Sequence, residues 1–86
     1  MTDVQKADLC NFCGVLPTDE SAVKVLEGCY EAAKAWYREN DVDVVMNPDA
    51  KFWIKNLTSW VYDNRGRSDA VIPAFIVTSV HLLREA

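Results

Sequence analysis

Long hydrophobic runs and basic clusters are both missing from this sequence. No apolar stretch approaches the ~20 residues that a helix needs to cross a bilayer. The nine lysine and arginine residues are scattered and the formal net charge is -4, so no positive stripe is available to follow a phosphate backbone. The segment MTDVQKADL has neither a basic leader nor an apolar core, so we expect no signal peptide and a chain kept in the cytosol. A membrane protein and a basic nucleic-acid-binding protein are therefore disfavoured.

Cysteine is sparse, and its three copies are an odd number that does not suit a secreted disulfide framework. Free thiols are the expectation. Cys10 and Cys13 have the spacing of half a zinc site, and Cys29 with His81 could complete a tetrahedral set. Because no second close pair exists, buried thiols that act as small hydrophobes are favoured, and zinc remains the alternative.

Glycine is also scarce, and none of the three glycines belongs to a phosphate-cradling loop or a nucleophile elbow. His81 has only Glu85 as a nearby carboxylate, so a solvated surface residue is favoured over a general base. Asp41, Asp43 and Asp49 lack the glycine and terminal glutamate of a calcium-binding loop, so a solvated acidic loop is favoured over a cation site. We therefore expect no enzyme activity and no cofactor.

The composition is that of one globular domain covering residues 1–86. Half of the residues are hydrophobic and 26% are charged, which excludes a disordered chain. Helical periodicity recurs in four segments, and no pair of strands stands out. The sequence therefore predicts an all-α fold, a small bundle of about four helices with a flexible loop between the second and third long elements.

Capping residues mark the first two helices. The first is expected to begin at Thr2 or Asp3 and to end at Gly14, and the second to be capped by Thr18 and to reach about Glu39. The following segment 40–47, NDVDVVMN, alternates imperfectly, so a loop is favoured over a short extended arm. Its apolar content leads to the hypothesis that it orders only on docking to a partner.

The third helix is predicted over 47–66, with Asn47 as cap, Pro48 in the first turn and Gly66 as the stop. Its core-facing residues fall within an arc of about 120°: they are Ala50, Trp53, Ile54, Leu57, Trp60 and Val61. Phe52 and Tyr62 are expected on the opposite, polar side. No other part of a small monomer is obviously available to cover them, so this pair suggests a docking surface.

The last helix is predicted to start near Pro73 and to run to the end of the sequence. Its main stripe consists of Ile72, Ile76, Val80 and Leu83. Phe75 and Leu82 flank one side of this stripe and Val77 the other, which leaves only a narrow polar arc. A helix so apolar needs more cover than a small monomer provides, and this favours oligomerisation.

The order of these elements resembles a known family of viral assembly proteins. The residues that carry it are a first helix ending in 9–14, the segment SAVKVLEGCYEAAKAWY, the helix ending YDNRG with Tyr62 and Arg65, and Ile72-Pro73 before a helix ending in Leu-Arg. Together they resemble the head-tail connector proteins of long-tailed bacteriophages, also called head-completion or DNA-packaging adaptor proteins. Cys10 and Cys13 depart from the pattern of that family.

The resemblance implies a structural protein at the virion head-tail junction, assembled in the cytoplasm of a bacterial host. It would form a homo-oligomeric ring of about a dozen copies under the portal protein and extend the DNA channel toward the tail. The other implied partner is a tail-side completion protein. DNA would pass through the channel without sequence-specific binding, and no membrane is involved.

The residues expected to lie at protein interfaces are Phe52, Tyr62, Arg65, Phe75, Val77 and Leu82. Two alternatives stay open. One is a small helical protein-binding adaptor or regulatory module, without a phage role, that docks a partner through Phe52 and Tyr62. The other is a zinc-dependent binding domain.

Overall fold

The chain forms four helices joined by turns and loops. The computed structural model describes residues 2–85, and the helices are α1 (Asp3–Cys13), α2 (Glu20–Glu39), α3 (Ala50–Asp63) and α4 (Ala74–Glu85). No strand occurs within residues 2–85. The predicted all-α class and the number of helices are confirmed.

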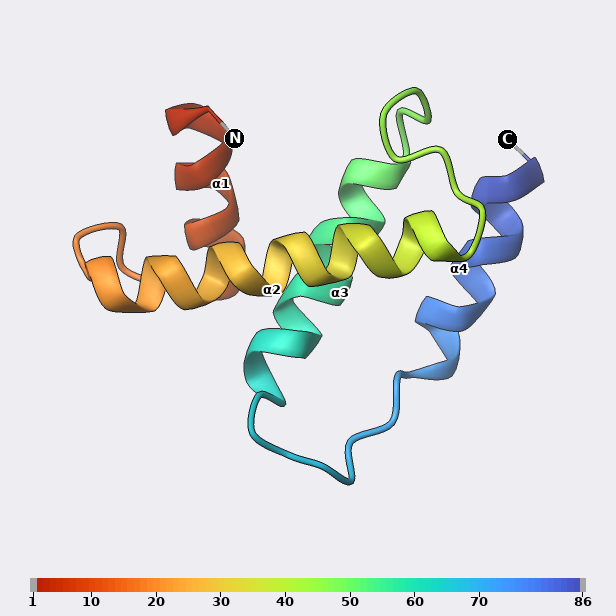
Figure 1. The fold of residues 1–86 in the computed structure, drawn as a ribbon. Helices are drawn as coiled ribbons and strands as arrows, with labels where there is room; N and C mark the ends of the chain where they lie inside the picture. The colour runs from red at the N-terminus through yellow and green to blue at the C-terminus, as the bar shows by residue number, and fades with distance from the viewer. Residues whose placement is uncertain (1, 86) are drawn as a thin grey trace.

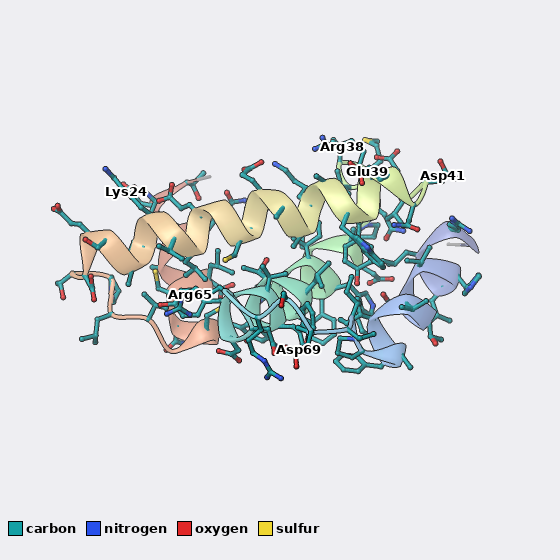
Figure 2. The ribbon with its side chains drawn as sticks, turned by 60° about the horizontal axis from the view of Figure 1, so that its bottom comes forward. Lys24, Arg38, Glu39, Asp41, Arg65 and Asp69 are labelled. Atoms are coloured by element: carbon teal, nitrogen blue, oxygen red, sulfur yellow. The ribbon has the colours of Figure 1, made fainter. Side chains whose placement is uncertain are left out.

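Helix α2 lies across one side of the other three helices. Figure 1 shows α2 passing in front of α1 and α3 and ending beside α4, and the view in Figure 2, turned by 60°, places α2 above them. The molecule measures 38 × 32 × 17 Å, so its thinnest dimension holds fewer than two full helix diameters, each about 10–12 Å. The protein is a flat slab with α1 toward one end and α4 toward the other (Figure 1).

The slab contains two groups of buried side chains. The larger joins α2, α3 and α4 and consists of Ala33, Tyr37, Val42, Ala50, Ile54, Leu57, Ile76, Val80 and Leu83. The smaller joins α1 to the first half of α2 and consists of Leu9, Cys10, Val15, Val23 and Leu26. The stripes predicted for the third and last helices supply Ala50, Ile54, Leu57, Ile76, Val80 and Leu83 of the larger group, so hydrophobic periodicity identified most of that core.

The ends of α1 match the prediction. The Thr2 hydroxyl accepts a hydrogen bond from the Gln5 N–H, while the Gln5 side chain accepts one from the Thr2 N–H, which makes a capping box. At the other end Gly14 has a φ of 72°, the left-handed conformation that stops a helix.

The N-cap of α2 is Asp19 and not Thr18. The Asp19 carboxylate accepts a hydrogen bond from the Ala22 N–H at 3.1 Å. An aspartate caps as well as a threonine, and its charge also favours the positive end of the helix, so the sequence offered two adjacent caps.

Helix α3 is shorter than predicted at both ends. Asn47 does not cap the helix: its side-chain oxygen accepts the Asp49 N–H in a preceding turn, and its amide donates to the Leu83 carbonyl of α4 at 2.8 Å. The helix ends at Asp63, and Gly66, with a φ of 81°, lies in the turn that follows. The turn-forming residues at both ends form turns of their own and do not extend the helix.

The segment 40–47 is a loop, as predicted, and its two halves differ. Val42 is 3% exposed and belongs to the larger core, whereas Val45 and Met46 are 81% and 76% exposed. Helix α2 ends just before it with Asp41 at a φ of 65°. The Asp41 N–H bonds to the Arg38 carbonyl and the Val42 N–H to the Tyr37 carbonyl, so the helix ends in a Schellman motif.

Candidate functional site

An open groove of about 330 Å³ lies between α1 and the first half of α3. Its lining residues are Gln5, Asp8, Leu9, Tyr30, Pro48, Lys51, Phe52 and Lys55. We call this set the α1–α3 groove. Tyr30 comes from α2, which crosses both α1 and α3. The groove combines apolar surface with a few charged groups, as protein-binding and ligand-binding sites commonly do.

The positive charge in the groove comes from two lysines with different surroundings. The Lys55 ammonium lies 3.0 Å from the Asp8 carboxylate and 5.0 Å from the centre of the Phe12 ring, so it ties α3 to α1. Lys51 is exposed and forms no ion pair with any residue among 2–85. The groove therefore offers one engaged and one unengaged cation beside apolar side chains.

Exposed apolar side chains continue from the groove onto α4. The rings of Phe52 and Trp53 meet edge to face at 5.5 Å, and the ring of Trp53 lies 6.4 Å from that of Phe75. Phe75, Val77 and Leu82 are 56%, 47% and 59% exposed. All of these except Trp53 were predicted to lie at interfaces, and the structure leaves them accessible to a partner.

Tyr62 does not lie where the sequence placed it relative to Phe52. Tyr62 is half-buried and packs against the smaller core, because α1 covers that side of α3. The Arg65 guanidinium lies 4.0 Å from the centre of the Tyr62 ring and donates a hydrogen bond to the Tyr62 carbonyl. The predicted pairing of Phe52 with Tyr62 on one uncovered face is therefore wrong.

Exposed apolar side chains also occur near the other end of the slab, at the start of α1, in the connection that follows α1, and on α2. Val4, Leu16 and Val25 are 80%, 71% and 44% exposed. Sequence periodicity did not single out Val4 or Leu16, because a valine at a helix start and a leucine in a short connection belong to no stripe.

The cysteines are mostly withdrawn from solvent. Cys10 and Cys29 are buried and Cys13 is half-buried. Burial raises the pKa of the Cys13 thiol, while its hydrogen bond with Ser59 opposes the rise. Burial also raises the pKa of Cys29, and the nearby Arg65 charge opposes it. Within the described range 2–85, no three histidine, cysteine or acidic side chains gather as a metal site.

The three acidic residues considered as loose cation ligands have separate places in the structure. Asp41 lies 3.8 Å from the Arg84 guanidinium, and Asp43 accepts hydrogen bonds from the backbone N–H groups two and three residues later. Asp49 is the N-cap residue of α3, and His81 is exposed on α4.

In the part of the chain that the structure describes, no helix is long and apolar enough to span a bilayer.

Comparisons with protein-family models, with curated proteins and with solved structures find no match to this chain. Function is therefore inferred from the surfaces of the chain and from the residues that carry the resemblance.

Proposed function

We propose that this protein is the structural subunit of a phage or prophage head-tail connector. Copies would assemble head to tail into a ring under the portal protein, at the head-tail junction, and extend the DNA channel toward a tail-side completion protein. Assembly would take place in the cytoplasm of the bacterial host. The observation that carries this proposal is the presence of exposed apolar side chains near both ends of a flat molecule.

A closed ring needs two different surfaces on each subunit. In such heterologous contacts, one surface of a subunit meets the other surface of its neighbour, whereas a two-fold dimer uses a single self-complementary patch. The α4 end exposes Phe75, Val77 and Leu82, and the α1–α2 end exposes Val4 and Leu16. Because these ends lie apart along the slab (Figure 1), a neighbour can cover each of them at the same time.

The residue pair that carries the family resemblance has a physical role at the end of α3. Arg65 stacks on the Tyr62 ring and bonds to the Tyr62 carbonyl, so the pair closes the helix and fixes the direction of the chain after it. A connection of ten residues, 64–73, then leads to α4.

The net charge of -4 is compatible with a channel through which DNA slides. Affinity for the phosphate backbone depends on clustered cations. A ring of acidic subunits without such a cluster would guide DNA without holding it.

A second function is supported by the α1–α3 groove. Its volume is near the lower limit of the ~300–1,000 Å³ typical of binding pockets, and it suits a small adaptor that binds a segment of another protein. This alternative requires neither a ring nor a portal protein.

Electron microscopy and sedimentation of the concentrated protein, alone and with the portal protein of the same phage or prophage, test the main proposal. We expect rings, either spontaneously or on the portal. A Phe75→Ser/Leu82→Ser variant should weaken ring formation, while His81→Ser, an exposed change on the same helix, should not. A protein that stays monomeric and has no affinity for the portal would contradict the proposal.

A further inference from the structure

We propose that the tip of the 40–47 loop of one copy docks into the α1–α3 groove of the next copy. The tip is defined as residues 43–46, with Val45 and Met46 as its docking side chains. This inference rests on the proposed function for its head-to-tail geometry, but it names a contact that can be tested by itself.

The tip is a shaped turn with two apolar side chains directed to solvent. One oxygen of the Asp43 carboxylate accepts hydrogen bonds from the Val45 N–H at 3.1 Å and the Met46 N–H at 3.0 Å. The Asn47 N–H also bonds to the Asp43 carbonyl at 3.1 Å. Yet Val45 and Met46 are 81% and 76% exposed, among the most exposed large hydrophobic residues of the chain. The fold thus orders a turn in which Val44 packs against the larger core, while the side chains of Val45 and Met46 are left to solvent.

Both ends of the loop are fixed to the rest of the protein. Val42 is buried in the larger core, and the Asn47 side-chain amide donates to the Leu83 carbonyl at 2.8 Å. From α4, the Arg84 Nε donates to the Asn40 carbonyl at 2.7 Å. A loop held in this way loses little conformational freedom when its tip is covered, and a preorganised segment binds more tightly for the same contacts.

The groove complements the tip in chemistry. Its accessible apolar part is Phe52, which is 55% exposed, together with the half-buried Tyr30, and these two side chains can cover Val45 and Met46. The Asp43 carboxylate uses one oxygen for the turn, and its second oxygen forms no hydrogen bond with any residue among 2–85. An ammonium group that has no ion pair, that of Lys51, lines the groove. An ion pair between Lys51 and Asp43 of the neighbouring tip would lie at the edge of an apolar contact, where it would fix the orientation of the tip more than it would raise the binding affinity.

The geometry favours a neighbour and not the same chain as the source of the tip. In Figure 1 the loop rises on the α4 side of α3, whereas α1, the other wall of the groove, lies on the opposite side of α3. Val45 and Met46 are 81% and 76% exposed, so the tip does not fill the groove of its own subunit, although Pro48, two residues after the tip, lines that groove. A neighbouring copy can therefore supply the tip, and in a head-to-tail assembly each subunit would use both features once.

Complementary variants test this contact. A tip variant, Val45→Ser/Met46→Ser, keeps its groove, and a groove variant, Lys51→Glu/Phe52→Ser, keeps its tip. We expect each alone to self-associate at least roughly tenfold more weakly than the unchanged protein, because two apolar anchors or their cover are lost. Mixed in equal amounts, they should form a one-to-one pair that does not grow, since only one working contact remains. Val71→Ser, at an equally exposed valine, is the matched control, and circular dichroism checks the fold.

Cross-linking supplies a readout that does not depend on strong self-association. Met46 is one of only two methionines, so a photoreactive methionine analogue places a probe in the tip. In a mixture of light and isotopically heavy chains, with and without the portal protein, we expect cross-links between copies from Met46 to groove residues such as Phe52. The absence of such cross-links under both conditions would overturn the inference.

The outcomes separate this inference from the proposed function. Rings that form unchanged from the tip variant would overturn the docking contact and leave the connector proposal standing. The opposite outcome is that the mixed variants form a one-to-one pair while the unchanged protein forms no ring and does not bind the portal protein. This result would support the docking contact and contradict the connector role.

Discussion

The Tyr37 hydroxyl lies 2.7 Å from the Ser79 hydroxyl, and the two residues, 42 positions apart in the sequence, are both fully buried. Ser79 donates its own proton to the Ile76 carbonyl. Tyr37 therefore donates to Ser79, and the bond joins α2 to α4 inside the larger core. This polar contact fixes how α4, which carries part of the proposed interface, sits against α2.

Because Tyr37 is the donor, the effect of Tyr37→Phe on the free energy of unfolding should change sign when Ser79 is replaced by alanine. Tyr37→Phe should lower the free energy of unfolding by about 1 kcal/mol, since a satisfied hydrogen bond is lost. Ser79→Ala should cost about 1–3 kcal/mol, because it leaves the Tyr37 hydroxyl buried without an acceptor. Adding Tyr37→Phe to Ser79→Ala should then restore stability. Urea denaturation of the four proteins measures this, and a destabilising effect of Tyr37→Phe in both backgrounds would contradict the assigned donor.

Stability should fall at alkaline pH because of the same tyrosine. Burial raises the pKa of Tyr37 above its ordinary value of 10.0, and the hydrogen bond with Ser79 partly offsets the rise. Above pH 10 the unfolded chain loses this proton while the folded chain keeps it. The contribution is therefore complete below pH 10 and is lost as pH rises through the folded-state pKa. Denaturation midpoints from pH 8 upward should decline less steeply in Tyr37→Phe than in the unchanged protein.

Asp41 occupies a backbone conformation that favours glycine. We expect Asp41→Ala to be less stable than Asp41→Gly by about 1 kcal/mol, because a φ of 65° strains a residue with a Cβ. Both variants lose the ion pair with Arg84, so their difference isolates the backbone. Equal thermal midpoints for the two variants would argue against the left-handed helix end.

The thiols should react slowly with alkylating reagents in the folded protein. Burial raises the pKa of Cys13 and Cys29, and the thiolate is the reactive form. Half-buried Cys13 should be modified before Cys10 or Cys29, and its rate should still be rising at pH 9. Mass spectrometry after timed alkylation measures this, with urea-unfolded protein as the reference. Rapid labelling of Cys10 in the native protein would contradict its burial.

Hydrophobic periodicity was sufficient to predict the helices and most of the core. The stripes that contain Ile54, Leu57 and Ile76 are buried as their spacing indicated, because a helix that packs on one side requires this pattern wherever its neighbours lie. Local capping was also readable at α1, where Thr2 and Gly14 act as predicted.

The candidate site was less predictable, because it depends on which helices meet. The sequence does not show that α1 covers the Tyr62 side of α3, so Tyr62 was misplaced while Phe52 was not. Nor does the sequence show that Asp41, just after α2, adopts a left-handed conformation, which is more usual for glycine. It also does not show that the following turn exposes Val45 and Met46 to solvent. These features come from tertiary packing and from turn hydrogen bonds, which have no periodic signature.

The central claim is that copies of this chain associate head to tail into a closed ring. Electron microscopy of the protein mixed with the portal protein of the same phage or prophage tests this claim most directly. We expect rings of uniform size seated on the portal, with the same face of every subunit toward it. Two-fold dimers, or a protein that remains monomeric and leaves the portal bare, would contradict it.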